Sequence, residues 1–215
     1  MPEPAHHLAQ QGGGHEPPTG SGSGGKPPVV LAKDEVRAML HAIEGPQAVR
    51  DRALIWMAYT TAARASELCG MEWQGIDWAR GRCRFWRRKV SGWHDVPLDL
   101  PQCVHALQAL ARAQRVAGRT IAPLSGPVFL SQRGGVLTPN GIWRIVKRWG
   151  GRAGIETGKA RPHVLRASRA THLIEDGAAL LAVKHLLGHR SITSTERYTR
   201  VAAGWLDGEL GKSSL

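Results

Sequence analysis

Four residues towards the C-terminal end carry side chains that phosphodiester chemistry needs: His163, Arg166, His189 and Tyr198. On a helix, His163 and Arg166 lie three positions apart and share one face. A guanidinium holds two nonbridging phosphate oxygens in bidentate fashion, while an imidazole beside it handles a proton. Each of these residues alone is typical of surface charge or a helix end, and the polar stretch 194–200 predicts an exposed tyrosine. Their conjunction indicates a site for a phosphodiester.

The chain contains only two tyrosines, and their surroundings differ. Tyr59 lies in the apolar run 53–59, where we expect it to pack in the core with its hydroxyl hydrogen-bonded. Tyr198 follows the predicted core helices, so it is the tyrosine available for chemistry. A phenol is a weak nucleophile near neutral pH, and it needs cationic groups around it to react.

The chain is strongly basic, with 29 lysines and arginines against 17 acidic residues and a net charge of +12. Such a charge favours a polyanionic partner, because like charges repel one another in a compact protein. Nucleic acid is the first candidate and an anionic membrane surface the second, while a merely soluble basic protein also accounts for the charge alone. Residues 1–28 carry a net charge of −1, which leaves +13 on the rest of the chain.

Three cysteines, at positions 69, 83 and 103, form no CxxC pair. This odd number at wide spacing argues against a disulfide framework or a zinc cage and favours a reducing compartment. The N-terminus has neither the basic region nor the apolar run of a signal peptide, and the apolar run 53–59 is too short to cross a bilayer. We therefore expect a cytoplasmic protein that is not membrane-bound.

The spacing of apolar residues predicts a tail followed by a mostly helical domain. Residues 1–28 are rich in glycine, proline, serine and histidine, which predicts a disordered tail. Helices are predicted over 33–44, 47–62, a short segment from 66, 101–118, 139–154, 163–176, 179–187 and 192–198. Extended segments are predicted over 76–78, 82–89, 93–98 and 128–131, the first three as one antiparallel sheet. The expected fold class is mainly α with a small antiparallel β-sheet.

Three sequence boxes, in order along the chain, resemble the motifs of the tyrosine recombinase (phage integrase) family. The first is TAARASEL at 61–68, and the second is KVSGWHDVPL at 89–98, which is similar to the family's β-hairpin. The third joins HVLR at 163–166 to LLGH at 186–189, and a tyrosine follows nine residues after the last histidine. The resemblance covers roughly 30–200, and a combination of several boxes is far more specific than one motif. It implies the catalytic-domain fold of tyrosine recombinases.

The resemblance also implies a role for each matching residue. Tyr198 would attack the scissile phosphate and form a 3′-phosphotyrosyl intermediate. Arg64 and Arg166 would hold the nonbridging oxygens and offset the charge of the transition state. Lys89 would protonate the 5′-oxygen leaving group, His163 would assist the proton transfer from the tyrosine, and His189 would hydrogen-bond the phosphate. No metal and no nucleotide cofactor is expected, because the phosphotyrosine stores the bond energy.

The same resemblance implies a domain layout and partners. A catalytic domain is expected over 29–200, and 201–215 is expected to be a terminal segment that docks on a neighbouring protomer. The expected partner is double-stranded DNA, on which four copies assemble at synapsis, with accessory DNA-bending proteins as further partners. Trp86 and Trp93 flank the predicted lysine loop and are candidates for DNA contact.

Three departures from the family pattern bear on these expectations. Ala62 stands where the family usually has glycine, and Ala167 replaces a histidine that often follows the second arginine. Only a predicted tail precedes the domain, whereas most members carry an N-terminal helical clamp. The chain resembles in this the short fimbrial phase-variation recombinases, or else a fragment of a longer integrase.

Other functions remain open beside an active site-specific recombinase. A truncated relic would bind DNA through its basic domain without strand exchange, and the intact set of six residues argues against it. A type IB topoisomerase shares the chemistry, but the short chain and the LLGH box favour a recombinase. A metal-dependent nuclease is the least favoured, since the histidines lie beside arginines rather than carboxylates.

Overall fold

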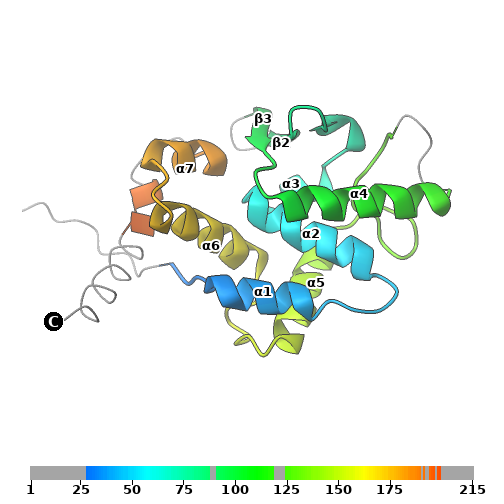
Figure 1. Cartoon of the computed structure of the whole chain (residues 1–215), viewed down its shortest axis with the longest axis horizontal. Helices are drawn as coiled ribbons and strands as arrows, with labels where there is room; N and C mark the ends of the chain where they lie inside the picture. Colours follow the sequence, from blue (N-terminus) through cyan, green and yellow to red (C-terminus); the bar gives the residue numbers. More distant parts are fainter. Residues whose placement is uncertain are drawn as a thin grey trace, which may run out of the picture.

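Seven α-helices and one three-stranded sheet form the described part of the chain (Figure 1). The computed structural model describes residues 28–87, 91–118, 124–189, 191, 194–196 and 198–199. The helices are α1 (Lys33–His41), α2 (Ala48–Thr60), α3 (Ala65–Cys69), α4 (Pro101–Val116), α5 (Pro139–Arg152), α6 (Pro162–Glu175) and α7 (Leu180–Leu187). A 3-10 turn, η1 (Trp73–Gly75), precedes the strands β1 (Ile76–Asp77), β2 (Arg82–Arg87) and β3 (Gly92–Pro97).

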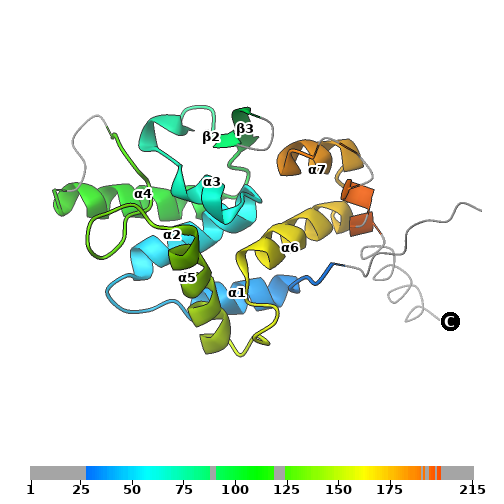
Figure 2. The ribbon, with the colours of Figure 1, turned by 180° about the vertical axis from the view of Figure 1, so that it is seen from behind.

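Helix α2 is the centre of the fold. Most of its residues are buried, including Leu54, Ile55 and Met57, and a helix that is buried on nearly all sides belongs inside a core. Helices α4 and α6 both pack on it, and the sheet lies on the side of α2 opposite to α1 and α5 (Figures 1 and 2). These contacts give the domain one main apolar core.

The sheet is antiparallel in the order β1-β2-β3. Alternate residues of β2 point inward, so Cys83, Phe85 and Arg87 are buried while the residues between them are more exposed. On the outer face Trp86 lies opposite Trp93, and their rings meet edge to face at 5.7 Å. An arginine on the inward face is unusual, because an unpaired buried charge is costly.

The predicted fold class is confirmed: the domain is mainly helical with one small antiparallel sheet. The extended segment predicted over 128–131 is not a strand; Leu130 makes only a single bridge with Val136. The described residues of the helix predicted over 192–198 are helical. The predicted tail up to residue 27 and the predicted docking segment 201–215 lie outside the described residues. No helix in the described ranges has both the length and the apolar character needed to cross a membrane.

A second, smaller apolar cluster lies apart from the main core, where α6 and α7 meet the turn that follows α2. Its buried members are Ala62, Ala167, Ala170, Val183, Leu187 and Tyr198. Half of these side chains are single methyl groups, so the cluster buries far less apolar surface than the main core does. We call it the tyrosine cluster.

Candidate active site

Five of the six predicted site residues line one cavity of about 350 Å³. The residues that line it come from α6, from the turns that follow α2 and α7, from the segment before α1 and from positions 194 and 198. Its predicted residues are Arg64, His163, Arg166, His189 and Tyr198. The sixth residue, Lys89, lies in the segment 88–90, outside the described residues. Residues that are 134 positions apart in the sequence are thus brought to one site.

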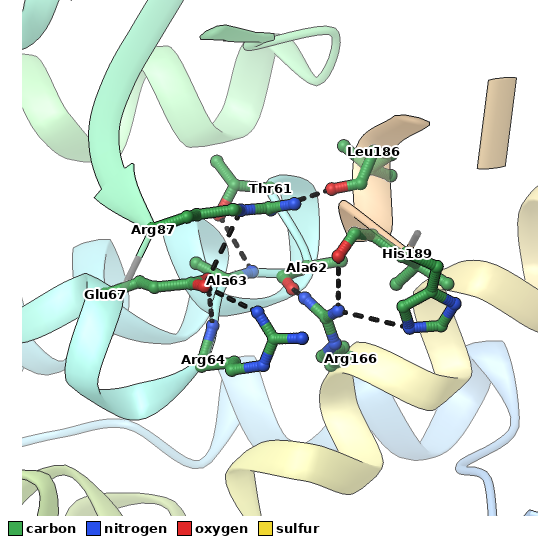
Figure 3. A network of polar contacts seen from close by, with 10 residues as sticks. Thr61, Ala62, Ala63, Arg64, Glu67, Arg87, Arg166, Leu186 and His189 are labelled. Atoms are coloured by element: carbon green, nitrogen blue, oxygen red, sulfur yellow. Dashed lines mark hydrogen bonds and ion pairs between the residues drawn. The ribbon is translucent and has the colours of Figure 1, made fainter. Parts of the chain in front are cut away.

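Arg64 is held by a carboxylate of its own helix. It is the N-cap of α3, and the Glu67 side chain accepts a hydrogen bond from its backbone N–H at 2.8 Å. The other oxygen of Glu67 accepts from Arg64 Nη1 at 2.7 Å. Because Glu67 is only 5% exposed, this pair fixes the orientation of the arginine side chain; Figure 3 shows the contacts between the two residues.

The turn before Arg64 depends on a left-handed residue. Ala62 has a φ of +48°, a conformation that costs an L-residue with a Cβ about 1–2 kcal/mol. The alanine therefore adopts a left-handed backbone at the position where the family usually has glycine. In this conformation its carbonyl accepts a hydrogen bond from Arg166 Nη1.

Arg166 joins two segments through their main chains. Besides the Ala62 carbonyl, it donates from Nη2 to the carbonyl of Leu187 at 2.6 Å, at the end of α7. Burial, with the nearby charge of Arg64, lowers the pKa of the Arg166 guanidinium to about 10, so it keeps its charge at neutral pH. His163, one turn earlier on α6, is exposed and lines the same cavity. The two residues share one side of the helix, as their spacing predicts.

His189 follows the left-handed C-cap of α7 at Gly188. Its Nδ1 lies 2.9 Å from the hydroxyl of Thr195, and its Nε2 lies 3.5 Å from Arg166 Nη2. A guanidinium can only donate, so the neutral imidazole that satisfies both contacts carries its proton on Nδ1. Thr195 thereby fixes the ring orientation and leaves Nε2 on the side of the arginine.

Tyr198 is buried, with 4% of its surface exposed, and the prediction of an exposed tyrosine is wrong. Its ring stacks on that of His189, with centroids 6.5 Å apart and planes 17° apart. The polar sequence misleads because the helical spacing turns Thr195 and Tyr198 to one buried side. Tyr59, by contrast, is where it was predicted: it is buried in the main core, and its hydroxyl lies 2.7 Å from Nδ1 of His172.

Sequence reasoning missed three residues that hold the site together: Glu67, Thr195 and Arg87. Arg87 is fully buried, 3.6 Å from Glu67 through its Nε, and donates from Nη2 to the carbonyl of Leu186 at 2.8 Å (Figure 3). The signal for Glu67 was its spacing of three from Arg64, which is that of a capping box. Arg87 gave no signal, because it lies in a run of basic residues that is typical of a solvated surface.

The phage integrase family model matches residues 29–204. The chain belongs to this family. It is 36% identical over 198 residues to the tyrosine recombinase XerD of Mycobacterium leprae, covering 86% of this chain and 60% of that protein. It is 32% identical over 191 residues to the tyrosine recombinase XerA of Pyrococcus furiosus, covering 87% of this chain and 63% of that protein. The chain thus spans about three fifths of the length of the curated relatives it matches.

Solved structures of the family have the same fold. A XerA recombinase superposes with a TM-score of 0.73 at 25% identity, covering 87% of this chain and 66% of that one. A XerH site-specific recombinase, solved in a post-cleavage complex with its difH substrate, gives 0.71 at 23% identity, covering 86% of this chain and 53% of that one. The helical domain with its small sheet is therefore the fold of tyrosine recombinase catalytic domains.

Proposed function

We propose that this chain is the catalytic part of a site-specific DNA recombinase that cuts and rejoins strands through a tyrosine. The observation that supports this most is the single cavity lined by two arginines, two histidines and the tyrosine of the family boxes. Family membership gives the reaction class, and the net charge of +12 suits a DNA partner.

In the proposed reaction, the Tyr198 hydroxyl oxygen attacks the scissile phosphorus. A bond forms between phosphorus and this oxygen, and the bond from phosphorus to the 5′-oxygen breaks. His163 takes the phenol proton, and Lys89 gives a proton to the departing 5′-oxygen. Arg64 and Arg166 stabilise the extra negative charge on the nonbridging oxygens. With DNA bound, His189 carries a proton on Nε2 and donates from it to one of these oxygens, while Nδ1 accepts from the Thr195 hydroxyl. Because one phosphodiester replaces another, the 5′-hydroxyl of a partner strand can reverse the step without a cofactor.

The proposed partners are double-stranded DNA and further copies of the chain. Among the structural neighbours, XerH is bound to its difH substrate, and a lambda integrase tetramer is bound to a Holliday junction. We propose a tetramer on DNA in which segment 201–215 docks on a neighbouring protomer. Truncation after Arg200 should then leave DNA binding intact and weaken synapsis, and unchanged recombination would contradict the docking.

The cleavage step can be tested without knowing the target site. In nicked duplexes with randomised half-sites, cleavage releases a short fragment that carries the free 5′-hydroxyl. Its loss prevents the reverse reaction, so the protein becomes trapped on the DNA that it cuts. The covalent adducts are isolated under denaturing conditions, and the attached DNA is sequenced. We expect one enriched site and a phosphotyrosine at Tyr198, and no adduct with Tyr198→Phe.

Two outcomes would contradict the proposal. An adduct formed by Tyr198→Phe would assign the nucleophile elsewhere. Tight binding of an enriched site with no adduct would favour the alternative of a chain that binds DNA without strand exchange.

A further inference from the structure

Arg87 lies immediately behind the candidate active site, yet the proposed chemistry does not use it. It is the last residue of β2, and its side chain is 0% exposed. The segment 88–90, which contains Lys89 and lies outside the described residues, begins at the next position. A fully buried arginine on the inward face of a strand needs an explanation, because this class of side chain is almost never buried without partners.

Two separate parts of the site meet at this guanidinium: Glu67 of α3 and the C-terminal end of α7. Its Nε forms an ion pair with Glu67 at 3.6 Å, and Glu67 is the carboxylate that orients Arg64. Its Nη2 donates to the carbonyl of Leu186, near the end of α7. Its Nη1 lies so close to Gly188 that a Cβ there would be only 1.8 Å away. Arg87 therefore contacts the support of one arginine and the turn that precedes His189 (Figure 3).

This arrangement is poor for stability alone. Nε and Nη1 of Arg87 find no hydrogen-bond partner among the described residues, and burial lowers the pKa of the guanidinium to about 10. Removal of one partner of a buried ion pair is costly when the other charge is left uncompensated, but here Glu67 keeps its ion pair with Arg64 when Arg87 is replaced. A methionine at position 87 would fill similar space beside Phe85, where the guanidinium now lies 5.2 Å from the ring.

We propose that Arg87 is a positioning residue of the cleavage site. It fixes the position of Glu67, and through Glu67 that of Arg64, relative to the end of α7. The inference rests on the proposed function, because it assigns Arg64 to the scissile phosphate. Without Arg87, Glu67 and Arg64 keep their own hydrogen bonds but lose their connection to the opposite wall. The arginine can then move relative to the phosphate, and a displacement of about 1 Å can reduce a rate roughly 100-fold.

The test compares cleavage of two substrates by Arg87→Met under single-turnover conditions at saturating DNA. One substrate is the enriched duplex from the trapping selection, and the other carries a neutral methylphosphonate at the scissile position. We expect Arg87→Met to cut the ordinary duplex roughly 10- to 100-fold more slowly than the unaltered chain. With the methylphosphonate the difference should nearly vanish, because a neutral centre needs less help from a cation. Arg64→Ala should behave in the same way.

The matched control is Arg152→Met. Arg152 is also paired with a glutamate, with its Nη1 2.9 Å from Glu44, but it is exposed at the end of α5. Both methionine variants lose one charge, so a similar loss of DNA affinity is expected for both. Only Arg87→Met should lose cleavage rate at saturation.

Several results would overturn the inference. If Arg87→Met slows both substrates equally, its role is structural only, since a partly folded preparation lowers both rates alike. If Arg87→Met fails to fold, Arg87→Lys is tested instead, because a single ammonium cannot contact both Glu67 and the Leu186 carbonyl as the guanidinium does. If neither variant folds, the inference is also rejected. A normal rate for Arg87→Met, with an active unaltered chain, rejects the inference alone. An unaltered chain that cleaves neither substrate rejects the proposed function first.

Discussion

The two sides of the candidate site are supported by apolar clusters of very different size. On one side, Arg64 and Arg166 come from α3 and α6, helices that also contribute to the main core. On the other side, Tyr198 belongs to the tyrosine cluster, in which half of the buried side chains are alanines. Apolar burial stabilises by about 25 cal/mol per Å², so the arginine side is held far more strongly.

In the proposed reaction, this difference matches the tasks of the two sides. Groups that stabilise charge in a transition state work best when they are fixed in advance. A nucleophile has to approach its target and leave it again, and elements with few apolar contacts open at lower free energy. We therefore expect the arginine side to stay rigid while the segment around Tyr198 opens locally.

The largest expected effect is that of Arg166→Ala, which removes the connection between the two sides. Both carbonyl acceptors lose their donor, and the phosphate loses a guanidinium. Cleavage should fall by about 100- to 1000-fold in the trapping assay, and amide exchange should accelerate from Leu187 onward. The control is Arg169→Ala, one turn further along α6, where a buried arginine pairs with Asp99 outside the cavity. An equal loss of cleavage in that control would show that the effect is general to α6.

A matched pair of leucines tests the difference in stability between the main core and the tyrosine cluster. Leu54 in the main core and Leu187 in the tyrosine cluster are both 0% exposed. Leu54→Ala should lower the free energy of unfolding by about 2–5 kcal/mol. Leu187→Ala should lower the free energy of unfolding by at least about 1 kcal/mol less than Leu54→Ala does, as measured by urea denaturation, because its small neighbours can relax around the gap. It should, however, accelerate amide exchange around Tyr198. Equal global losses would contradict the distinction between the two sides.

Acid should weaken the arginine side through His172 of α6. Burial lowers the pKa of His172 to about 4 from an ordinary value near 6.5. The unfolded chain therefore takes up a proton at a higher pH than the folded one, and stability falls as the pH drops from about 6.5 to about 4. The free energy of unfolding should fall by about 3 kcal/mol over this pH range. In His172→Gln, urea denaturation at the same pH values should show no such decrease. The same pH dependence in the variant would assign the acid sensitivity to other groups.

The smallest effect is expected at the turn between the two sides. Ala62→Gly relieves about 1–2 kcal/mol of left-handed strain but removes a buried methyl worth about 0.8 kcal/mol and adds backbone freedom in the unfolded chain. The free energy of unfolding should therefore change by less than about 1 kcal/mol. Ala63→Gly, at the next buried position but without a positive φ, should cost more. A larger loss at 62 than at 63 would mean that the left-handed turn carries no strain.

Local patterns in the sequence were enough to predict most of the fold and the residues that gather at the cavity. The helices and strands follow from apolar spacing and turn residues, and Arg64 and His189 lie in short boxes of fixed spacing. These features depend on neighbours within a few positions, so they are legible without the tertiary structure.

What the sequence could not predict depends on contacts between distant segments. Arg87 is buried because α7, which lies 99 residues further on, covers it. Tyr198 is buried because it packs in a cluster with residues from α6, α7 and the turn after α2. No local pattern distinguishes this arginine from its basic neighbours, or this tyrosine from an exposed one.

The hydrogen bonds of Arg166 have a consequence for how the site can diversify. Its acceptors on both sides are carbonyls of the main chain, at Ala62 and Leu187. Every amino acid supplies such a carbonyl, so side chains on both walls can be replaced during evolution or laboratory selection without removing the acceptors. Variant libraries aimed at new DNA sites can therefore sample positions around the cavity while the anchoring of this guanidinium is retained.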